Sequence, residues 1–320
     1  MAYTVLIPQD VVEEGKKYLT DRGYKIKMGS GVTVEAIIKD VADCDAILAR
    51  TAPFPREVIL AGPRLKVIGR HGVGVDNIDV KTCTEKGIWV TYAPESNANS
   101  VAEYAVGQII ALARNLLAGD KATRSMDWEF RNRVKGSDLA GKTLGLVGAG
   151  RVGAMTAKKA FYGLEMKVIV YDPYVKAIPG VPEATIVPDL ETVFRTADFI
   201  SLHMPATPET RGMIGKKYFE MMKKSAFLVN AARGEVVNEK DLYEALRSRR
   251  IAGAGLDVFD PEPPLADNPL YGLDNVILSP HNAALTLEAM TRMAVHAAMG
   301  IDDALSGRTP KWPVNKPVGK

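Results

Sequence analysis

The chain has 320 residues, of which 47% are hydrophobic and 25% are charged. This length exceeds the size at which a single hydrophobic core usually keeps growing, so we expect two domains. The net charge of +3, from 41 basic and 38 acidic residues, is too small to indicate nucleic acid or an anionic membrane as a partner.

The first residues and the cysteines indicate the compartment. Met1–Ile7 lack the basic segment of a signal peptide and fit a first β-strand. No apolar run is long enough to cross a bilayer. Cys44 and Cys83 do not have the spacing of a metal site, so we expect free thiols and no bound metal. These features together predict a cytoplasmic protein.

Short apolar runs alternate with helix-like segments over the first hundred residues. Such alternation is typical of a parallel sheet covered by helices, so we predict a first α/β domain. A glycine-rich loop at 71–74 precedes its last strand. The expected strands are Thr4–Ile7, Lys25–Met28, Ala46–Ala49, Val67–Ile68 and Ile88–Thr91, and the expected helices are Val11–Arg22, Val34–Val41 and Pro55–Ala61.

A long apolar helix is predicted next. Ser100 and Glu103 have the spacing of a capping box, so we expect the helix to begin at Ser100 and to end at about Leu117. Its residues are apolar nearly all the way round, and such a helix must be buried on several sides. It either crosses the interior between the domains or packs on a second subunit. Residues 120–141 are polar and irregular, with Trp128 as the expected local anchor.

A βαβ unit with a dinucleotide-binding fingerprint follows. The apolar run Thr143–Val147 leads into Gly148-x-Gly150-x-x-Gly153, and a helix is predicted to about Phe161. Gly148 permits the tight turn, Gly150 lets the backbone approach a pyrophosphate, and Gly153 lets the helix pack closely on the sheet. The first residues of that helix would face the phosphate charge.

The second strand of this unit indicates which dinucleotide is bound. Lys167–Tyr171 is an apolar run that ends at Asp172, 19 positions after Gly153. A carboxylate at this point would accept hydrogen bonds from the ribose hydroxyls and repel a 2′-phosphate. The sequence therefore predicts NAD rather than NADP as the cofactor.

Further alternation of strands and helices completes a doubly wound nucleotide-binding domain. The helix Leu287–Leu305 is long enough to cross back to the first domain, and the proline-containing tail Thr309–Lys320 is expected to be poorly ordered. The other expected strands are Ala184–Val187, Phe199–Leu202, Ala226–Asn230, Ile251–Leu256 and Val276–Leu278, and the other expected helices are Leu190–Thr196, Gly215–Met222 and Asn238–Arg249.

Three polar residues, Arg233, Glu262 and His281, lie at strand ends or in loops, where open α/β sheets bind ligands. Hydride transfer between NAD and a hydroxyl carbon needs a proton acceptor, and an imidazole is the usual choice. A carboxylate on the other ring nitrogen would stabilise the imidazolium, and a guanidinium would bind a substrate carboxylate. Taken singly, each residue is more typical of a cap, a loop or the surface, so the site exists only if the three meet.

These segments, with Gly72–Asp79 and the fingerprint, closely resemble the D-isomer-specific 2-hydroxyacid dehydrogenase family. The resemblance runs from about Ala46 to Ala283 in five separated blocks. It implies an α/β fold with two doubly wound parallel sheets, in which a Rossmann NAD-binding domain is inserted in a flavodoxin-like substrate domain. The implied boundaries are 1–99 with 286–320 for the substrate domain and 100–285 for the NAD-binding domain.

The resemblance also implies individual roles. Arg233 would bind the substrate carboxylate and carbonyl, His281 would act as acid and base, and Glu262 would support its charged form. Asp257 would hold the nicotinamide carboxamide. The implied cofactor-binding residues are Gly148, Gly150, Arg151, Val152, Gly153, Asp172, His203, Ala231 and Asp257, and the implied substrate-binding residues are Arg50, Arg70, Val73 and Gly74.

The substrate is less narrowly defined. Formate dehydrogenases carry glutamine in place of Glu262, and D-lactate dehydrogenases carry tyrosine in place of Ser96. Arg50 and Arg70 match positions at which 3-phosphoglycerate dehydrogenases hold anionic groups, although arginines at strand ends are also common on surfaces. Because 39 residues follow His281, we expect a short 3-phosphoglycerate dehydrogenase without a regulatory domain. A reductase of glyoxylate, hydroxypyruvate or another 2-keto acid is the alternative.

Two further expectations concern partners. Dehydrogenase-like corepressors share this fold and sense NAD, and several keep the catalytic residues, so the three polar residues do not exclude that role. Turnover with a panel of 2-keto acids would separate the two classes. We also expect a homodimer, from family habit and from the apolar surface of Val101–Leu117.

Overall fold

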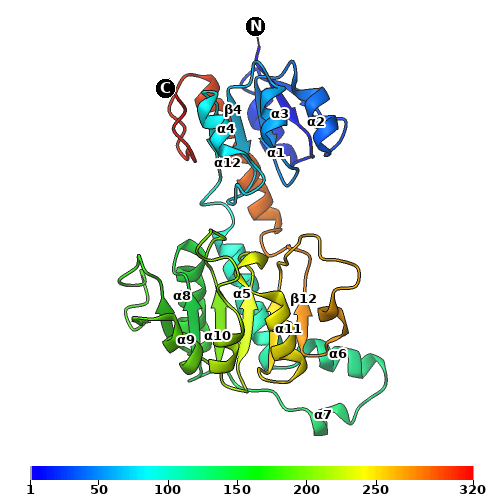
Figure 1. Cartoon of the computed structure of the whole chain (residues 1–320), viewed down its shortest axis with the longest axis vertical. Coiled ribbons are helices and arrows are strands. Elements are labelled where there is room, and N and C mark those ends of the chain that lie inside the picture. The colour runs from blue at the N-terminus through cyan, green and yellow to red at the C-terminus, as the bar shows by residue number, and fades with distance from the viewer. Residues whose placement is uncertain (1, 320) are drawn as a thin grey trace. The chain divides into compact units, whose positions relative to one another are not determined.

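The computed structural model describes residues 2–319 and contains two compact α/β units (Figure 1). Unit 1 comprises Met1–Asn97 and Ala284–Lys320, and unit 2 comprises Ala98–Ala283. Each unit contains one sheet in which all strands are parallel, with five strands in unit 1 and seven in unit 2. The predicted α/β class is therefore confirmed. Between residues 2 and 319 no helix is long and apolar enough to cross a membrane.

Unit 1 has the strand order β2-β1-β3-β4-β5, which is the doubly wound order of flavodoxin-like folds. Its strands are built from the short apolar runs of the first hundred residues. Strands β3 and β5 are fully buried, whereas β2 at the edge of the sheet is partly exposed. The strands are β1 Thr4–Ile7, β2 Lys25–Met28, β3 Ala46–Ala49, β4 Val67–Arg70 and β5 Trp89–Thr91, and the helices are α1 Glu13–Thr20, α2 Val34–Val41, α3 Arg56–Leu60, α4 Val80–Glu85 and α12 Leu287–Leu305.

The last helix, α12, belongs to unit 1, as the sequence predicted. It packs on α1 and on β4, and Figure 1 shows it beside both. Two glycines allow the close approach. A Cβ at Gly15 would lie 2.6 Å from the Ala294 side chain, and one at Gly69 would lie 2.7 Å from the Ala297 carbonyl. Small residues thus connect the end of the chain to its beginning.

The tail was wrongly expected to be poorly ordered, because it packs along β5. Val314 donates a backbone hydrogen bond to the Val90 carbonyl at 2.8 Å. The Asn315 side chain accepts from the Val90 amide at 2.8 Å and donates to the Ile88 carbonyl at 3.0 Å. Trp312 is buried against His296. The tail occupies backbone groups of the edge strand, which composition alone did not indicate.

Unit 2 has the strand order β12-β11-β10-β9-β6-β7-β8. Renumbered from β6, this is the order 3-2-1-4-5-6 of the Rossmann fold with one added strand. The strands are β6 Thr143–Val147, β7 Lys167–Tyr171, β8 Thr185–Ile186, β9 Phe199–Leu202, β10 Phe227–Asn230, β11 Gly253–Leu256 and β12 Val276–Leu278, and the helices are α5 Ala98–Ala113, α6 Leu116–Arg124, α7 Phe130–Arg133, α8 Arg151–Leu164, α9 Leu190–Thr196, α10 Lys216–Met221 and α11 Glu239–Arg247.

The long apolar helix α5 differs from the prediction at both ends. It begins at Ala98, so Ser100 is a buried residue inside the helix rather than its cap. It ends at Ala113, because Asn115 adopts a left-handed conformation with φ of 52°. Its apolar residues pack within unit 2, on α8 and on strands β10 and β11. Burial inside its own unit thus accounts for most of the apolar surface of α5.

The segment after α5 was expected to be irregular and anchored by Trp128, and both expectations were wrong. It forms the short helices α6 and α7. Trp128 is 66% exposed, with the Arg131 guanidinium 5.8 Å from the centre of its ring. Leu116, Leu117 and Met126 are also exposed. We call residues 114–138 the arm of unit 2.

Candidate active site

Three neighbouring parallel strands of unit 2 bring the predicted polar residues to one edge of the sheet. Strands β10, β11 and β12 are paired in register, so that Asn230, Leu256 and Leu278 end the strands side by side. Arg233 follows β10, Glu262 follows β11 and His281 follows β12. The sequence predicted strand-end positions, and the register explains why those positions are neighbours.

Glu262 and His281 form a direct pair. The Oε2 atom of Glu262 lies 2.8 Å from Nδ1 of His281, and Oε1 accepts a hydrogen bond from the Phe259 amide at 3.0 Å. Burial by itself raises the pKa of the Glu262 carboxyl, but the hydrogen bond and charge of His281 outweigh it, and the pKa is lowered. Glu262 is therefore ionised at neutral pH and favours the imidazolium form of its partner.

Because Nδ1 of His281 faces Glu262, Nε2 is the ring nitrogen that can exchange a proton with a substrate. The imidazole is 48% exposed, which leaves it accessible. The backbone at His281 is left-handed, with φ of 51°. This conformation is uncommon for a residue with a side chain, so neighbouring contacts must hold it.

Arg233 lies at the same edge, held by the polar end of β10. The Asn230 side chain donates to the Arg233 carbonyl at 2.8 Å and accepts from the Ala232 amide at 3.1 Å. The charge of Arg233 contributes to the lowered pKa of Glu262. A Cβ at Gly234 would lie 1.9 Å from the Phe259 carbonyl. Glycine at 234 thus lets the segment of Arg233 run against the segment that carries Glu262.

The glycine-rich loop of unit 2 has the geometry that its fingerprint predicts. Gly148 has φ of +92°, and a Cβ there would lie 2.7 Å from the His203 carbonyl. A Cβ at Gly153 would lie 2.3 Å from the Gly148 carbonyl, whereas nothing lies within 4 Å of one at Gly150. Two glycines therefore permit close packing, and the third leaves open backbone at the start of α8. This arrangement fits a dinucleotide pyrophosphate.

Asp172 is tied to the same loop. One carboxylate oxygen accepts from the Ala149 amide at 2.7 Å, and the other accepts from the Tyr174 amide at 2.8 Å. Each oxygen keeps a lone pair for a further donor, such as a ribose hydroxyl. The carboxylate therefore fixes the loop and remains able to bind a ligand.

His203 lies behind the glycine loop. Its Nε2 is 3.0 Å from the hydroxyl of buried Ser201, and its Cβ would be 3.6 Å from a Cβ at Gly153. Burial lowers the pKa of His203 to about 4, so the ring is neutral at neutral pH. The other expected cofactor-binding residues lie at the start of α8, where Arg151 and Val152 form its first turn, and after β10, where Ala231 follows Asn230.

Asp257 is fully buried at the end of β11. Its carboxylate accepts hydrogen bonds from the Ser279 hydroxyl at 2.7 Å, the Asn282 amide at 3.0 Å and the Ala283 amide at 2.9 Å. Neither Ser279 nor Asn230, at the end of β10, was predicted from the sequence as a residue of the site. The available signal was a polar residue directly at the end of a buried strand.

In unit 1 the expected substrate-binding residues lie in the loop at 71–74 or close to it. Arg70 donates to the His71 carbonyl at 2.5 Å and to the Gly74 carbonyl at 2.7 Å, while Arg50 donates to the Asp10 carbonyl at 2.7 Å. Burial is the largest cause that lowers the pKa of His71 to about 4, and the charges of Arg50 and Arg70 contribute to the same shift. Both guanidinium groups therefore lie within electrostatic range of one imidazole. Val73 is partly exposed, and Gly74 follows it.

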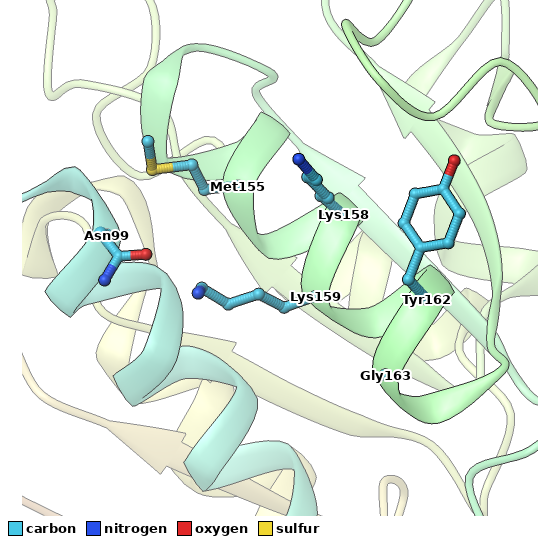
Figure 2. Close-up of a pocket in the computed structure, with 6 residues that line it drawn as sticks. All are labelled: Asn99, Met155, Lys158, Lys159, Tyr162 and Gly163. Atoms are coloured by element: carbon cyan, nitrogen blue, oxygen red, sulfur yellow. The ribbon is translucent and has the colours of Figure 1, made fainter.

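A pocket of about 550 Å³ lies elsewhere on unit 2 (Figure 2). Asn99 of α5 lines one side, and α8 supplies all the other side chains, as Figure 2 shows. The lining includes none of the three polar residues and none of the glycine loop. Its residues are Asn99, Met155, Lys158, Lys159, Tyr162 and Gly163.

Known proteins resemble the chain over nearly its whole length. Residues 106–283 match the family model described as "D-isomer specific 2-hydroxyacid dehydrogenase, NAD binding domain". The chain is 42% identical to the D-3-phosphoglycerate dehydrogenase of Methanocaldococcus jannaschii, covering 98% of this chain and 59% of that protein. It is 40% identical to the glyoxylate reductase of Korarchaeum cryptofilum, covering 89% of this chain and 87% of that protein.

Solved structures agree. The TT0316 protein of Thermus thermophilus superposes with a TM-score of 0.91 at 33% identity, covering 98% of this chain and all of that chain. A glyoxylate reductase from Paecilomyes thermophila superposes with a TM-score of 0.88 at 28% identity, covering 98% of each chain. The chain spans about three fifths of the length of the M. jannaschii relative, 59%. Unit 2 is thus similar to NAD-binding domains in sequence and in fold.

A comparison of NADH with NADPH tests the expected role of Asp172 beside the ribose. We expect a higher kcat/KM with NADH than with NADPH, because a carboxylate beside the ribose repels a 2′-phosphate. Asp172→Ala should lower the ratio of kcat/KM with NADH to kcat/KM with NADPH by roughly 10- to 100-fold, which corresponds to the loss of one charge-assisted hydrogen bond. Steady-state kinetics with both cofactors measures it, with Asp274→Ala, a surface carboxylate, as the control. Equal kcat/KM values in the unmodified protein would contradict the assignment.

Proposed function

Because the chain belongs to the D-isomer-specific 2-hydroxyacid dehydrogenase family, we propose that it catalyses reversible NAD-dependent hydride transfer between a 2-hydroxyacid and a 2-keto acid. The observation that carries the proposal is the 2.8 Å contact between Glu262 and His281, at the sheet edge that also carries Arg233. An acid and base, its carboxylate partner and a guanidinium are the groups that this reaction requires.

The cofactor would be held by the glycine loop of unit 2. The open backbone at Gly150 and the first turn of α8 would bind the pyrophosphate, and Asp172 would bind the ribose. Oδ2 of Asp257 accepts one hydrogen bond from the chain, so it retains a lone pair for the nicotinamide carboxamide. When bound, NADH supplies the hydride for reduction and NAD⁺ accepts it in oxidation.

The chain's own residues would bind the acid and move the proton. Arg233 would bind the substrate carboxylate through charge-assisted hydrogen bonds. In reduction, imidazolium at His281 would donate the Nε2 proton to the carbonyl oxygen, and in oxidation the neutral ring would accept the hydroxyl proton. Ionised Glu262 would stabilise the imidazolium and fix Nδ1 as the protonated nitrogen when the ring is neutral.

The substrate class rests on Arg50 and Arg70. We propose an acid with a second anionic group, such as 3-phosphoglycerate, because two guanidinium groups lie near one loop of unit 1. The named D-3-phosphoglycerate dehydrogenases at about 40% identity support this reading. A glyoxylate or hydroxypyruvate reductase is the second candidate, since Arg70 already binds two carbonyls of its own loop. An NAD-sensing corepressor would bind the cofactor without turnover of any keto acid.

Substitution of Arg70 separates the two substrate classes. With a phospho-substrate, Arg70→Ala should raise KM by roughly 10- to 100-fold through loss of a charge-assisted hydrogen bond, and KM for glyoxylate should change much less. Steady-state kinetics with both substrates measures the difference, and Arg64→Ala, which removes the ion pair to Asp45, is the control. Equal losses for both substrates would show that Arg70 only holds the loop, and would refute the phosphoglycerate reading.

The Glu262–His281 pair predicts opposite pH dependence in the two directions. Reduction needs imidazolium at His281 and oxidation needs the neutral ring, so the rate of reduction should fall as pH rises and the rate of oxidation should increase. Because Glu262 favours the charged ring, Glu262→Gln should move the falling limb of reduction to lower pH. His281→Ala should lower kcat by about 10² to 10⁴ with NADH binding nearly unchanged.

These pH–rate profiles need a control carboxylate outside the site. Glu244→Gln removes a charge from the surface pair with Arg247 and should leave the profile in place. A profile that did not move in Glu262→Gln, or a kcat largely retained in His281→Ala, would refute the assigned roles.

We also propose a homodimer located in the cytoplasm. The two cysteines are free and buried, which suits a reducing compartment. The arm of unit 2 exposes Leu116, Leu117, Met126 and Trp128, and the pocket of Figure 2 exposes Met155 and Tyr162. Such exposed apolar side chains favour contact with a second copy.

Light scattering at micromolar concentration tests the dimer. The unmodified protein should have the mass of two chains, and the double variant Leu117→Asp with Trp128→Asp should have the mass of one, because a buried unpaired carboxylate opposes association. Met28→Asp, at an exposed apolar position of unit 1, should leave the dimer intact. A monomeric unmodified protein would refute this proposal.

A further inference from the structure

One buried residue, Asp257, accepts several hydrogen bonds from the turn that carries His281. The Asp257 main-chain carbonyl accepts from the His281 amide at 2.8 Å. Its carboxylate accepts from the Ser279 hydroxyl, the Asn282 amide and the Ala283 amide, at 2.7, 3.0 and 2.9 Å. Asp257 is fully buried, so the hydrogen bonds from these donors compensate its carboxylate for the loss of hydration.

This connection follows from the strand register. Leu256 pairs with Leu278 in the parallel sheet, so Asp257 and Ser279, the next residue on each strand, emerge side by side. The Ser279 hydroxyl bridges them, and the chain then turns back through the left-handed His281. That conformation is uncommon for a residue with a side chain, and the hydrogen bonds to Asp257 hold the backbone of the turn in it.

The partner carboxylate depends on the same short segment. Phe259 lies two residues after Asp257, and its amide donates to Oε1 of Glu262 at 3.0 Å. The segment 257–259 therefore holds His281 through its first residue and Glu262 through its last. A shift of either attachment would change the distance between Oε2 and Nδ1.

We propose that Asp257 and Ser279 are positioning residues that set the Glu262–His281 pair by fixing the 279–283 turn. The inference deepens the proposed function and rests on it for its kinetic readout. Asp257 also retains the lone pair assigned above to the carboxamide, so its substitution would disturb cofactor binding as well. The Ser279 hydroxyl donates to the Asp257 carboxylate at 2.7 Å and lies 3.3 Å from the Leu256 carbonyl of β11. It has no role assigned in cofactor or substrate binding, so Ser279 is the residue to test.

The kinetic experiment compares Ser279→Ala with Ser279→Thr, which keeps a hydroxyl. Misplacement of a catalytic group by about 1 Å can cost about 10²-fold in rate. Ser279→Ala should therefore lower kcat for keto-acid reduction by about 10- to 100-fold, with the Kd of NADH within about twofold. Ser279→Thr should restore most of the rate. Ser248→Ala, which removes a hydroxyl from the end of α11, should change neither value.

The pH profile distinguishes positioning from simple loss of stability. In Ser279→Ala the falling limb of reduction should move to lower pH, as it does in Glu262→Gln, because a displaced ring loses its carboxylate. Adding Glu262→Gln to Ser279→Ala should then give no further shift, since both changes act on one pair. A lower melting temperature with an unmoved limb, or fully additive shifts, would overturn the proposal.

Hydrogen–deuterium exchange tests the turn without any turnover. The amides of residues 281–283 donate to Asp257, so they should exchange about tenfold faster or more in Ser279→Ala and at the unmodified rate in Ser248→Ala. If the unmodified protein reduces no keto acid, the proposed function fails while this measurement still applies. Unchanged exchange in Ser279→Ala would overturn the inference whatever the activity.

Discussion

The buried carboxylate of Asp257 is the constraint on which the site depends. A carboxylate buried at the end of β11 must find hydrogen-bond donors inside the protein. The donors that it finds are the backbone and hydroxyl groups of the turn that carries His281. The hydrogen bonds that the buried Asp257 carboxylate requires therefore also fix the turn of His281. The imidazole is 48% exposed, so it can be accessible to a substrate while its backbone is held in place.

On the neighbouring strand β10 a neutral side chain, the amide of Asn230, holds a turn in the same way. Asn230 ends β10, is almost fully buried, and uses both ends of its amide to hold the turn of Arg233. An amide suffices there because Arg233 presents a permanent charge and only its position must be fixed. On the strand next to β10 the buried group is a carboxylate, which accepts from three donors of the turn that carries His281. Parallel pairing places these ends together, which is why ligands bind at this edge of doubly wound sheets.

Sequence patterns predicted the parts of this arrangement that depend on local residues. The glycine spacing predicted the tight turn at Gly148, and β12 and α12 have the predicted bounds. The start of α5 was predicted two residues too late. The spacing of Ser100 and Glu103 is that of a capping box, although the two residues before Ser100 are already helical. The tail and Ser279 were missed because their partners, β5 and Asp257, are distant in sequence. Register, rather than propensity, determines such contacts.

The loop at 71–74 shows where residue type alone leaves two roles open. We propose that Arg70 binds an anionic group of the substrate, and its guanidinium already donates to two carbonyls of its own loop. Five donors in a planar fork allow one arginine both to support a loop and to bind an anion. Gly72, with φ of +145°, brings the backbone so close that a Cβ would lie 3.0 Å from that guanidinium. Arg70 and the loop therefore form one structural element. A substrate that bound Arg70 would also influence the conformation of the loop backbone, because Arg70 donates to its carbonyls.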